Sequence, residues 1–511
     1  MPKRIKDTEY IKDNYEEMTI SKNIDESLEI FEILLGENSD FVIRTFEVGD
    51  KKVRGFLIYI DGMIDKYLIN KNVLEPIMIE TRKIRDLPFT KKQFFESIKE
   101  RFFAVSDINE KNKIKDILDS VFGGDTAIIF DGIEQAIIIA TKGWAGRSVT
   151  ESTTESYVRG PKEAFVETLR INTSMIRRRI KHPDFIIENM KIGRYSNTDV
   201  SIAYIKSIAD IKVVEEVKKR LGKIKIDGII DSGYLEEFIE DNPFSPFPQV
   251  AHTEKPDKAA AQILEGKVAV LADGSPFALT VPAIFVEFFQ SAEDYYERYF
   301  LSSILRVLRI SAMFIALLLP SIYIAETTFH QEMIPTQLAI SIAAQREGVP
   351  FPALLEALFM ETFFEILREA GIRLPMQVGQ AVSIVGGLVI GQAAVQAGLV
   401  SPAMVIVVAM TGIASFSIPA FNIAITFRIL RFVMMIAAGT LGFFGIIMVL
   451  MMLSAHMASM ESFGVPYLSP ISPGRNQELS DVFIRIPWWA KILRPRTIQR
   501  ENVIRQEDIR G

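Results

Sequence analysis

The chain has 511 residues, of which 49% are hydrophobic and 24% charged, and its formal net charge is −6. This length exceeds what one hydrophobic core supports, so about two to four domains are expected. The absence of cysteine excludes disulfides and cysteine-ligated metal sites. The negative charge, without a basic array interleaved with aromatic residues, gives no support to nucleic-acid binding.

Charge is unevenly distributed along the chain. Charged residues are dense up to Arg309 and sparse after it, which indicates a soluble half followed by a membrane half. Residues 1–24 are charged and lack the apolar core of a signal peptide. The soluble half is therefore expected to remain in the cytoplasm.

The first part of the soluble half shows an α/β pattern. Asp131-Gly132 lies between two apolar runs and predicts the turn of a hairpin. The expected strands are 41–48, 53–61, 127–132 and 135–140, and the expected helices are 65–79 and 91–100.

Residues 156–180 predict a helix, because Pro161 suits its first position and a run of three arginines suits its last turn. Asn172 lies on its apolar stripe and must find a hydrogen-bond partner, in a neighbouring loop or strand, or in a ligand or another subunit. The three arginines either lie in solvent or pair with acidic lipid headgroups or a partner chain. The candidates for assembly or an interface are Arg159, Asn172, Arg177, Arg178 and Arg179.

A second α/β unit follows, with strands expected at 199–205, 226–230 and 267–274 and a helix at 213–221. Asn242–Pro248, NPFSPFP, is too rich in proline for regular structure and predicts a fixed loop. The sequence shows no P-loop, no GxGxxG after a strand and no HExxH, and its four histidines are scattered. We therefore expect no catalytic residues, no metal site, no cofactor and no enzyme activity.

The membrane half is centred on Leu374–Phe427, 54 positions without Asp, Glu, Lys or Arg. Between the first span and this stretch, prolines and charges within 325–375 predict a broken or re-entrant pair of half-helices. Arg306 and Arg309 are expected to extend to the lipid headgroups. The expected full spans are 305–324, 376–400, 403–427 with a kink at Pro419, and 432–457.

Four spans would return the C-terminal tail to the cytoplasmic side, in agreement with its basic residues. Arg428 and Arg431 would then lie outside, against the rule that cytoplasmic loops are positive. Five or six spans remain possible if the broken region crosses. The basic residues of the tail are Arg475, Arg485, Lys491, Arg494, Arg496 and Arg500.

Two features of the membrane half suggest an ion path. Met376–Val400 has a narrow face of small and polar residues, which either packs against another helix through the GxxxG at 387–391 or lines a pore. Glu356 lies on the apolar face of residues 351–370, where it either pairs with an arginine such as Arg346 or Arg373 or contacts a cation. The pore-lining candidates are Gln380, Ser383, Gly387 and Gly391.

The predicted fold is an α/β soluble N-terminal region of two subdomains, followed by an all-α multi-spanning membrane domain with about four full spans and a broken or re-entrant helical region. The expected boundaries are 1–24 for a charged N-terminal segment, 25–150 and 151–298 for the two subdomains, 299–460 for the membrane domain and 461–511 for a basic cytoplasmic tail.

Several long blocks resemble the GerA family of spore germination proteins, specifically the A subunit of nutrient germinant receptors. Together they span roughly residues 150–490, whereas the first 140 residues match only in general character. The blocks include VRGPKE at 158–163, NPFSPFPQ at 242–249, TTFHQEMIPT at 327–336, REGVPFPALLEA at 346–357 and GQAVSIVGGLVIGQAAV at 379–395.

The resemblance implies a subunit of the inner-membrane receptor of a dormant spore, with a transporter-like B subunit and a lipoprotein C subunit as partners. The A subunit would form a homo-oligomer in the lipid membrane and open an ion path when the B subunit binds a nutrient. The alternatives are a secondary transporter that binds substrate itself, and an A-subunit paralogue that acts with the dipicolinate release channel.

Overall fold

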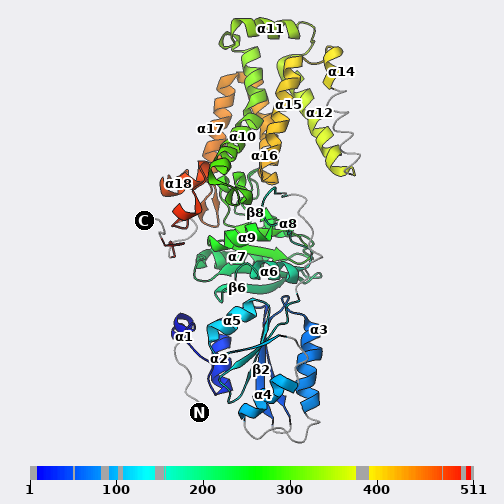
Figure 1. Cartoon of the computed structure of the whole chain (residues 1–511). Coiled ribbons are helices and arrows are strands. Elements are labelled where there is room, and N and C mark those ends of the chain that lie inside the picture. Colours follow the sequence, from blue (N-terminus) through cyan, green and yellow to red (C-terminus); the bar gives the residue numbers. More distant parts are fainter. Residues whose placement is uncertain are drawn as a thin grey trace. The chain divides into compact units, whose positions relative to one another are not determined.

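The computed structural model describes residues 8–49, 52–81, 91–101, 107–143, 155, 157–375, 391–474, 476–495 and 502–507. The chain divides into two compact units (Figure 1). Unit 1 combines Met1–Glu240, Val250–Pro282 and Leu493–Glu507, and unit 2 combines Asp241–Gln249 with Ala283–Ile492.

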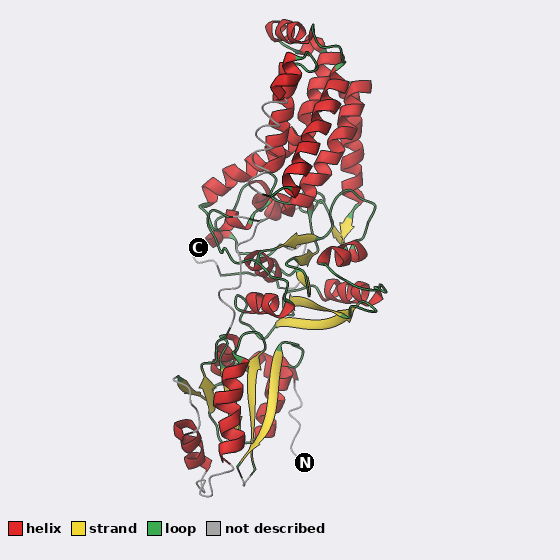
Figure 2. Ribbon diagram, turned by 90° about the vertical axis from the view of Figure 1, so that its right-hand side faces the viewer, coloured by secondary structure: helices red, strands yellow, loops and turns green. Residues whose placement is uncertain are grey.

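Unit 1 contains two five-stranded antiparallel sheets, each packed against helices (Figure 2). The first sheet has the order β1-β2-β4-β5-β3. Its strands are β1 Phe41–Val48, β2 Val53–Ile60, β3 Ile108–Lys111, β4 Thr126–Phe130 and β5 Ala136–Ile139. The accompanying helices are α1 Thr8–Asn14, α2 Ile24–Leu35, α3 Lys66–Ile69, the π-helical turns Asn70–Leu74 and Pro76–Glu80, α4 Lys91–Arg101 and α5 Ile114–Phe122.

Helices cover both faces of this first sheet because its central strands carry unbroken apolar runs, such as residues 56–58 in β2 and 127–130 in β4. In β2, Phe56 and Ile58 pack with α2 and α5, whereas Leu57 packs with α3, α4 and the π-helical turns. Successive side chains of a strand point to opposite faces, so an unbroken apolar run requires a layer on each side.

The second sheet repeats the order of the first, as β6-β7-β9-β10-β8. In both halves an Asp-Gly turn follows the fourth strand, and its aspartate accepts a hydrogen bond from the first helix: Asp131 from Ile24 N at 3.5 Å and Asp273 from Leu169 N at 2.9 Å. The two subdomains thus share one topology. The elements of the second are α6 Leu169–Arg177, β6 Phe185–Ile192, β7 Thr198–Ile205, α7 Ile211–Lys223, α8 Ser232–Ile239, β8 Ala251–Thr253, α9 Pro256–Leu264, β9 Val268–Ala272 and β10 Ala278–Val281.

Most predicted strands of unit 1 are present, and two predictions were wrong. Residues 226–230 are an irregular segment, although Ile229 is buried. The helix expected to begin at Pro161 within 156–180 begins only after its N-cap Thr168 and has nine residues, so Pro161 lies outside it. The apolar residues of its predicted stripe are buried, but the part of the stripe before Leu169 lies in irregular chain and not in a helix.

Unit 2 is a helical bundle (Figure 2). Two of its helices, α10 and α16, are long and apolar enough to cross a membrane, while α15 and α17 are apolar but shorter. Its helices are α10 Tyr299–Thr328, α11 Thr336–Arg346, α12 Ala353–Arg373, α14 Gly391–Gln396, α15 Pro402–Phe416, α16 Phe421–Leu441, α17 Phe443–Ser459 and α18 Asn476–Phe483. The short elements are the 3-10 helices Phe285–Phe289, Ala292–Tyr295, Gln331–Met333 and Trp488–Ala490, and the strands β11 Glu461–Ser462 and β12 Val465–Pro466.

The helix boundaries correct the predicted spans. Pro419 does not kink one long span, because α15 ends at Phe416 and α16 begins at Phe421. The next break is at Gly442, whose φ of +63° favours glycine. The segments 403–427 and 432–457 are therefore not single spans, and four full spans are not confirmed. The second half of the region predicted as broken is one continuous helix, α12, of 21 residues.

The NPFSPFP segment is a fixed loop of unit 2, as predicted. The ring of Phe247 packs against the rings of Phe427, His456 and Tyr467, with centroids 6.2–6.4 Å apart. Ser245 Oγ lies 2.9 Å from His456 Nε2. The loop thereby joins α16, α17 and the segment after α17.

Candidate functional site

The helix α12 packs closely against α15 and α16. A Cβ atom at Gly412 of α15 would lie 2.5 Å from the ring of Phe364, and one at Gly439 of α16 would lie 2.6 Å from Leu354. Both glycines therefore admit side chains from α12 that any larger residue would displace. Close approach through small residues is the usual way for apolar helices to pack in a membrane.

The centre of this contact is a buried ion pair. Arg431 Nη1 of α16 donates to Glu361 Oε2 of α12 at 2.6 Å, and both side chains are 0% exposed. Arg431 is the middle residue of α16. A charge in that position is costly in lipid unless it is paired.

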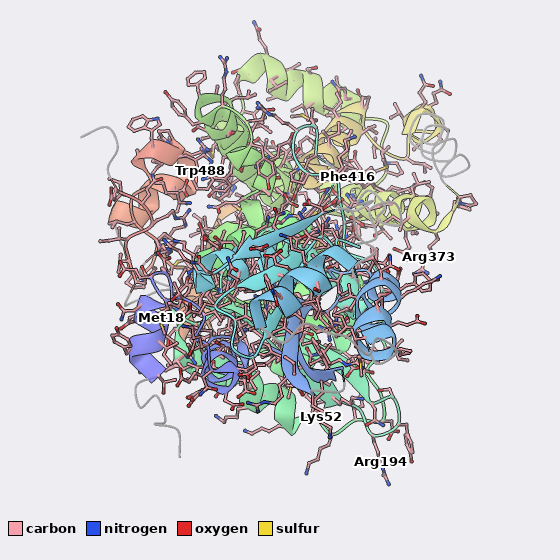
Figure 3. The ribbon with its side chains drawn as sticks, turned by 60° about the horizontal axis from the view of Figure 1, so that its bottom comes forward. Met18, Lys52, Arg194, Arg373, Phe416 and Trp488 are labelled. Atoms are coloured by element: carbon pink, nitrogen blue, oxygen red, sulfur yellow. The ribbon has the colours of Figure 1, made fainter. Side chains whose placement is uncertain are left out.

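A second set of charges lies next to this pair on the same helices. Arg428 Nη1 donates to Glu365 Oε2 at 3.0 Å, and Arg368 Nη1 lies 3.6 Å from Glu365 Oε1. Arg368 also donates to Ser415 Oγ at 2.6 Å and lies over the ring of Phe416, which is labelled at the end of α15 in Figure 3. The network thus connects α12 to both α15 and α16.

The pairing within this network is incomplete. It contains three arginines and two glutamates, so one positive charge remains. Within the part of unit 2 that the structure describes, Glu361 Oε1, Glu365 Oε1, and Nε and Nη2 of Arg431 have no hydrogen-bond partner. A buried polar atom without a partner costs about 1–3 kcal/mol.

Glu356, the candidate ion contact, is paired within the chain. Its side chain is 0% exposed, and its Oε2 lies 3.8 Å from Arg346 Nε, which is the pairing that the sequence suggested. Its Oε1 accepts hydrogen bonds from the backbone N–H and the hydroxyl of Ser401, the N-cap residue of α15. A carboxylate at a helix N-terminus is favoured by the helix dipole.

Arg306 and Arg309 do not extend to lipid headgroups, so that prediction was wrong. Arg306 is 0% exposed and lies 3.6 Å from Asp294 and 3.3 Å from Asp481. Arg309 Nη1 donates to Asp294 at 2.8 Å. These arginines tie the first turns of α10 to the segments before it and after α17.

Two of the candidates in unit 1, Asn172 and Arg177, are buried. Asn172 forms two hydrogen bonds with the backbone of Val166, which is the local partner expected for it. Arg177 is 0% exposed, so the solvent-exposed position considered for it was wrong. It donates to Asp40 with Nε and Nη2, both at 3.0 Å, and to Asn38 at 2.8 Å, and so connects the two subdomains.

Arg178 and Arg179 both pair with Glu163, at 3.3 and 2.9 Å. Burial opposes ionisation of Glu163, but the hydrogen bond from Arg179 and the charges of both arginines hold its pKa below the ordinary value. Arg159 is exposed. The role of these residues in assembly stays a prediction.

Of the four pore-lining candidates, Gln380, Ser383 and Gly387 lie outside the described residues. Gly391 is buried at the start of α14, and a Cβ atom there would lie 3.7 Å from Val405 of α15, an ordinary contact distance. Among the described residues, no group of three or more His, Asp or Glu side chains is placed to hold a metal ion.

Sequence reasoning missed the network because it treated Arg428 and Arg431 as loop residues. A signal was present in the spacing of the charges. Glu361 and Glu365 are four residues apart, and Arg428 and Arg431 are three apart, so in a helix each pair would lie on one face. Matching these spacings would have suggested that the two helices are neighbours.

Comparison with known proteins decides the family. A profile described as Bacillus/Clostridium GerA spore germination protein matches residues 29–497. The chain belongs to this family. The resemblance inferred from the sequence blocks is confirmed.

Several relatives match nearly the whole length of this GerA-family chain. Spore germination protein KA of Bacillus subtilis (strain 168) is 47% identical over 96% of this chain and 88% of its own. The uncharacterized membrane protein YfkQ of the same organism is 45% identical over 98% and 97%. Spore germination protein GerLA of Bacillus cereus is 40% identical over 93% and 95%.

Solved structures similar to part of the chain include the N-terminal domain of the A subunit of the Bacillus megaterium spore germinant receptor GerK3. It is 35% identical, with 52% of this chain and 98% of that chain covered and a TM-score of 0.41.

Proposed function

We propose that this protein is the membrane subunit of a spore nutrient germinant receptor, located in the spore inner membrane, and that it oligomerises to form a ligand-gated ion path. The observation that carries the proposal is the family match over residues 29–497, which includes both the soluble and the helical parts. The receptor would include the transporter-like B subunit and the lipoprotein C subunit, with both the N-terminal domain and the C-terminal tail on the cytoplasmic side.

The charge network supports an integral membrane role for unit 2. Exposed apolar side chains cover α10 and α16, for example Phe300 at 70% and Ile429 at 58%, whereas Glu361 and Arg431 are enclosed. This arrangement, apolar outside and charged inside, is that of a helical bundle in lipid. In water the same distribution would be unfavourable.

The incomplete pairing in the network supports assembly. Within this network of three arginines and two glutamates, one positive charge is unbalanced and several buried atoms have no hydrogen-bond partner among the described residues. Water or a neighbouring subunit has to supply the missing partners. An oligomer around a hydrated path supplies both.

Within this proposal, the network is an anchor for α12. This helix leads directly into Met376–Val400, the segment whose small-residue face is proposed to line the path. Gln380, Ser383, Gly387 and Gly391 are the proposed lining residues, and Glu356 is a proposed cation contact at the start of α12.

The test is ion release from spores that carry Gly387→Trp. If Gly387 faces the path, a bulky ring there blocks or locks conduction, so release after nutrient addition changes strongly at normal subunit abundance, checked by immunoblot. Gly348→Trp is the matched control, because a side chain at Gly348 meets no atom within 4 Å. Unchanged release in Gly387→Trp spores would remove the pore assignment.

A complete deletion of the gene tests the wider role. Spores that lack the protein should lose the response to a nutrient. Spores that keep every nutrient response but release less dipicolinate would instead support the paralogue that acts with the dipicolinate channel.

A further inference from the structure

Residues 481–491, which comprise the end of α18 and the segment that follows it, have charged side chains inside and apolar side chains outside. Of the charged side chains, Arg485 is 4% exposed and Lys491 is 9% exposed. A segment that faces water does the opposite, with charged groups outside and aromatic groups inside. The exposed large apolar side chains of the segment are Phe483 at 46%, Ile484 at 62%, Trp488 at 47% and Trp489 at 46%.

Asp481 fixes this segment to the start of the bundle. Its carboxylate accepts hydrogen bonds from Tyr295 Oη at 3.0 Å and from Lys491 Nζ at 2.7 Å, and it pairs with Arg306 of α10. Arg485 N donates to Ser303 Oγ of α10 at 3.0 Å. The charged groups are therefore held by specific partners, which leaves the aromatic side chains on the outside.

The exposed apolar surface continues onto α10. This helix has 30 residues, which corresponds to a length of about 45 Å. The hydrocarbon core of a bilayer is about 30 Å thick, so the ends of such a helix extend into the headgroup region. The exposed apolar residues of its first three turns are Tyr299, Phe300, Leu301, Ile304, Leu305, Val307 and Leu308.

We propose that residues 481–491 form an interfacial anchor that lies in the headgroup region of the lipid bilayer, with Trp488 and Trp489 at the boundary between headgroups and acyl chains. Tryptophan is enriched at this depth because its ring is apolar and its N–H is polar. Trp488 is labelled in Figure 3 beside the C-terminal segment, and its Nε1 donates to Tyr295 O at 3.1 Å. The inference rests on the membrane location proposed above.

Lipid is the partner that fits this surface. Its exposed large side chains are aromatic and aliphatic, while Asp481 and Lys491 pair with each other. The buried Arg485 donates through Nη2 to Tyr295 O at 3.5 Å. The surface is also continuous with α10, which is one of two helices among the described residues that are long and apolar enough to cross a membrane. The anchor would fix the depth at which the buried Asp294 and Arg306 pair lies, at the level where α10 enters the hydrocarbon.

The chain offers a direct test because it contains only three tryptophans, Trp144, Trp488 and Trp489. The full chain with Trp144→Phe is reconstituted into phosphatidylcholine and phosphatidylglycerol vesicles, some with bromine near the carbonyl end of the acyl chains and some with bromine near the chain terminus. We expect fluorescence quenching about twofold or more stronger with bromine near the carbonyl end. Iodide in the aqueous phase should quench the tryptophan fluorescence of the reconstituted chain less than that of the unfolded chain.

Two results would overturn the inference. Full access to iodide without quenching by brominated lipid would place the tryptophans in water. Protection from both quenchers would place them against protein, such as a second copy of the chain. If Trp144→Phe does not fold, the difference between the unmodified chain and a Trp488→Phe, Trp489→Phe double variant isolates the same signal.

Flotation of the vesicles separates this inference from the proposed function. A chain that floats with the vesicles but has water-exposed tryptophans refutes the anchor alone. A chain that does not float refutes the membrane location, and with it both proposals.

Discussion

Replacing Glu361 by glutamine tests whether the buried network holds α12 against α16. The carboxylate lies 2.6 Å from Arg431, and both side chains are 0% exposed. Without it, the guanidinium stays buried and loses its nearest counter-charge. Breaking a buried pair in this way costs about 3–5 kcal/mol. For a unit of this size, that corresponds to a fall of roughly 6–20 °C in the midpoint of thermal unfolding.

The measurement is thermal unfolding of the full chain in detergent, followed by tryptophan fluorescence. Glu369→Gln is the matched control on the same helix, because its pair with Arg373 is 60% and 78% exposed. Figure 3 labels Arg373 at the end of α12. An exposed pair is worth about 0–1 kcal/mol, so this variant should unfold near the temperature of the unmodified chain.

The double variant Glu361→Met, Arg431→Met separates stability from conduction. Replacing both charges by apolar side chains removes the uncompensated charge, so its stability should be close to that of the unmodified chain. Equal midpoints of thermal unfolding for Glu361→Gln and Glu369→Gln would show that the buried pair does not hold α12 against α16. Spores with the stable double variant should still release ions, since the network is an anchor. Loss of release at normal abundance would show that the charges themselves serve conduction.

Two further predictions concern unit 1. Arg177→Met should lower the free energy of unfolding by about 3–5 kcal/mol, because it leaves the buried Asp40 unpaired. Arg178→Met should cost about 0–1 kcal/mol in the same urea titration, because its pair is partly exposed and Glu163 keeps Arg179 as a partner. Burial raises the pKa of Glu155, but the charge and hydrogen bond of Lys258 and the hydrogen bond from Thr253 lower it below its ordinary value of 4.5. The stability from this group is therefore present above about pH 4.5 and lost as the pH falls through the lowered pKa. Urea titrations between pH 7 and 3 should show this loss of stability in the unmodified chain and a smaller loss in Lys258→Met. An equal loss in the two chains would contradict the role assigned to Lys258 in lowering the pKa of Glu155.

The sequence predicted the soluble half well where strands are long and apolar. The strand β1 was predicted at its observed bounds, and β2, β4, β5, β7 and β9 were found within a few residues. The strand β6 was missed because Glu188, Asn189 and Lys191 interrupt its apolar pattern. Residues 226–230 were mistaken for a strand because Ile226, Ile229 and Ile230 form a short apolar run. Ile229 is buried and Ile230 is exposed, and the run does not pair in a sheet.

The shared topology of the two subdomains was not visible in the sequence. The hairpins Thr126–Ile139 and Val268–Val281 each carry an Asp-Gly turn, yet their apolar residues differ. Packing needs an apolar side chain of suitable size at each position, so the same sheet order tolerates many sequences. The equivalence is revealed by the matching strand orders and by the hydrogen bonds that Asp131 and Asp273 accept from the first residues of α2 and α6.

In the membrane half, arginine was a misleading signal for a helix end. A hydropathy argument places Arg428 and Arg431 in a loop because each would be costly within a span. Glu361 and Glu365 of α12 offset this cost, so α16 continues through both arginines. The true breaks have local causes that the sequence does carry, Pro419 between α15 and α16 and Gly442 with its positive φ.

These breaks bear on how the bundle can move. Separating α12 from α16 would expose Glu361 and Arg431 to lipid, which costs several kcal/mol. The joint after α15, at residues 417–420, and the joint at Gly442 need no ion pair to open. For an ion path gated by nutrient, the low-cost motion is therefore one in which α12 and α16 move together as a rigid pair and the chain bends at these joints.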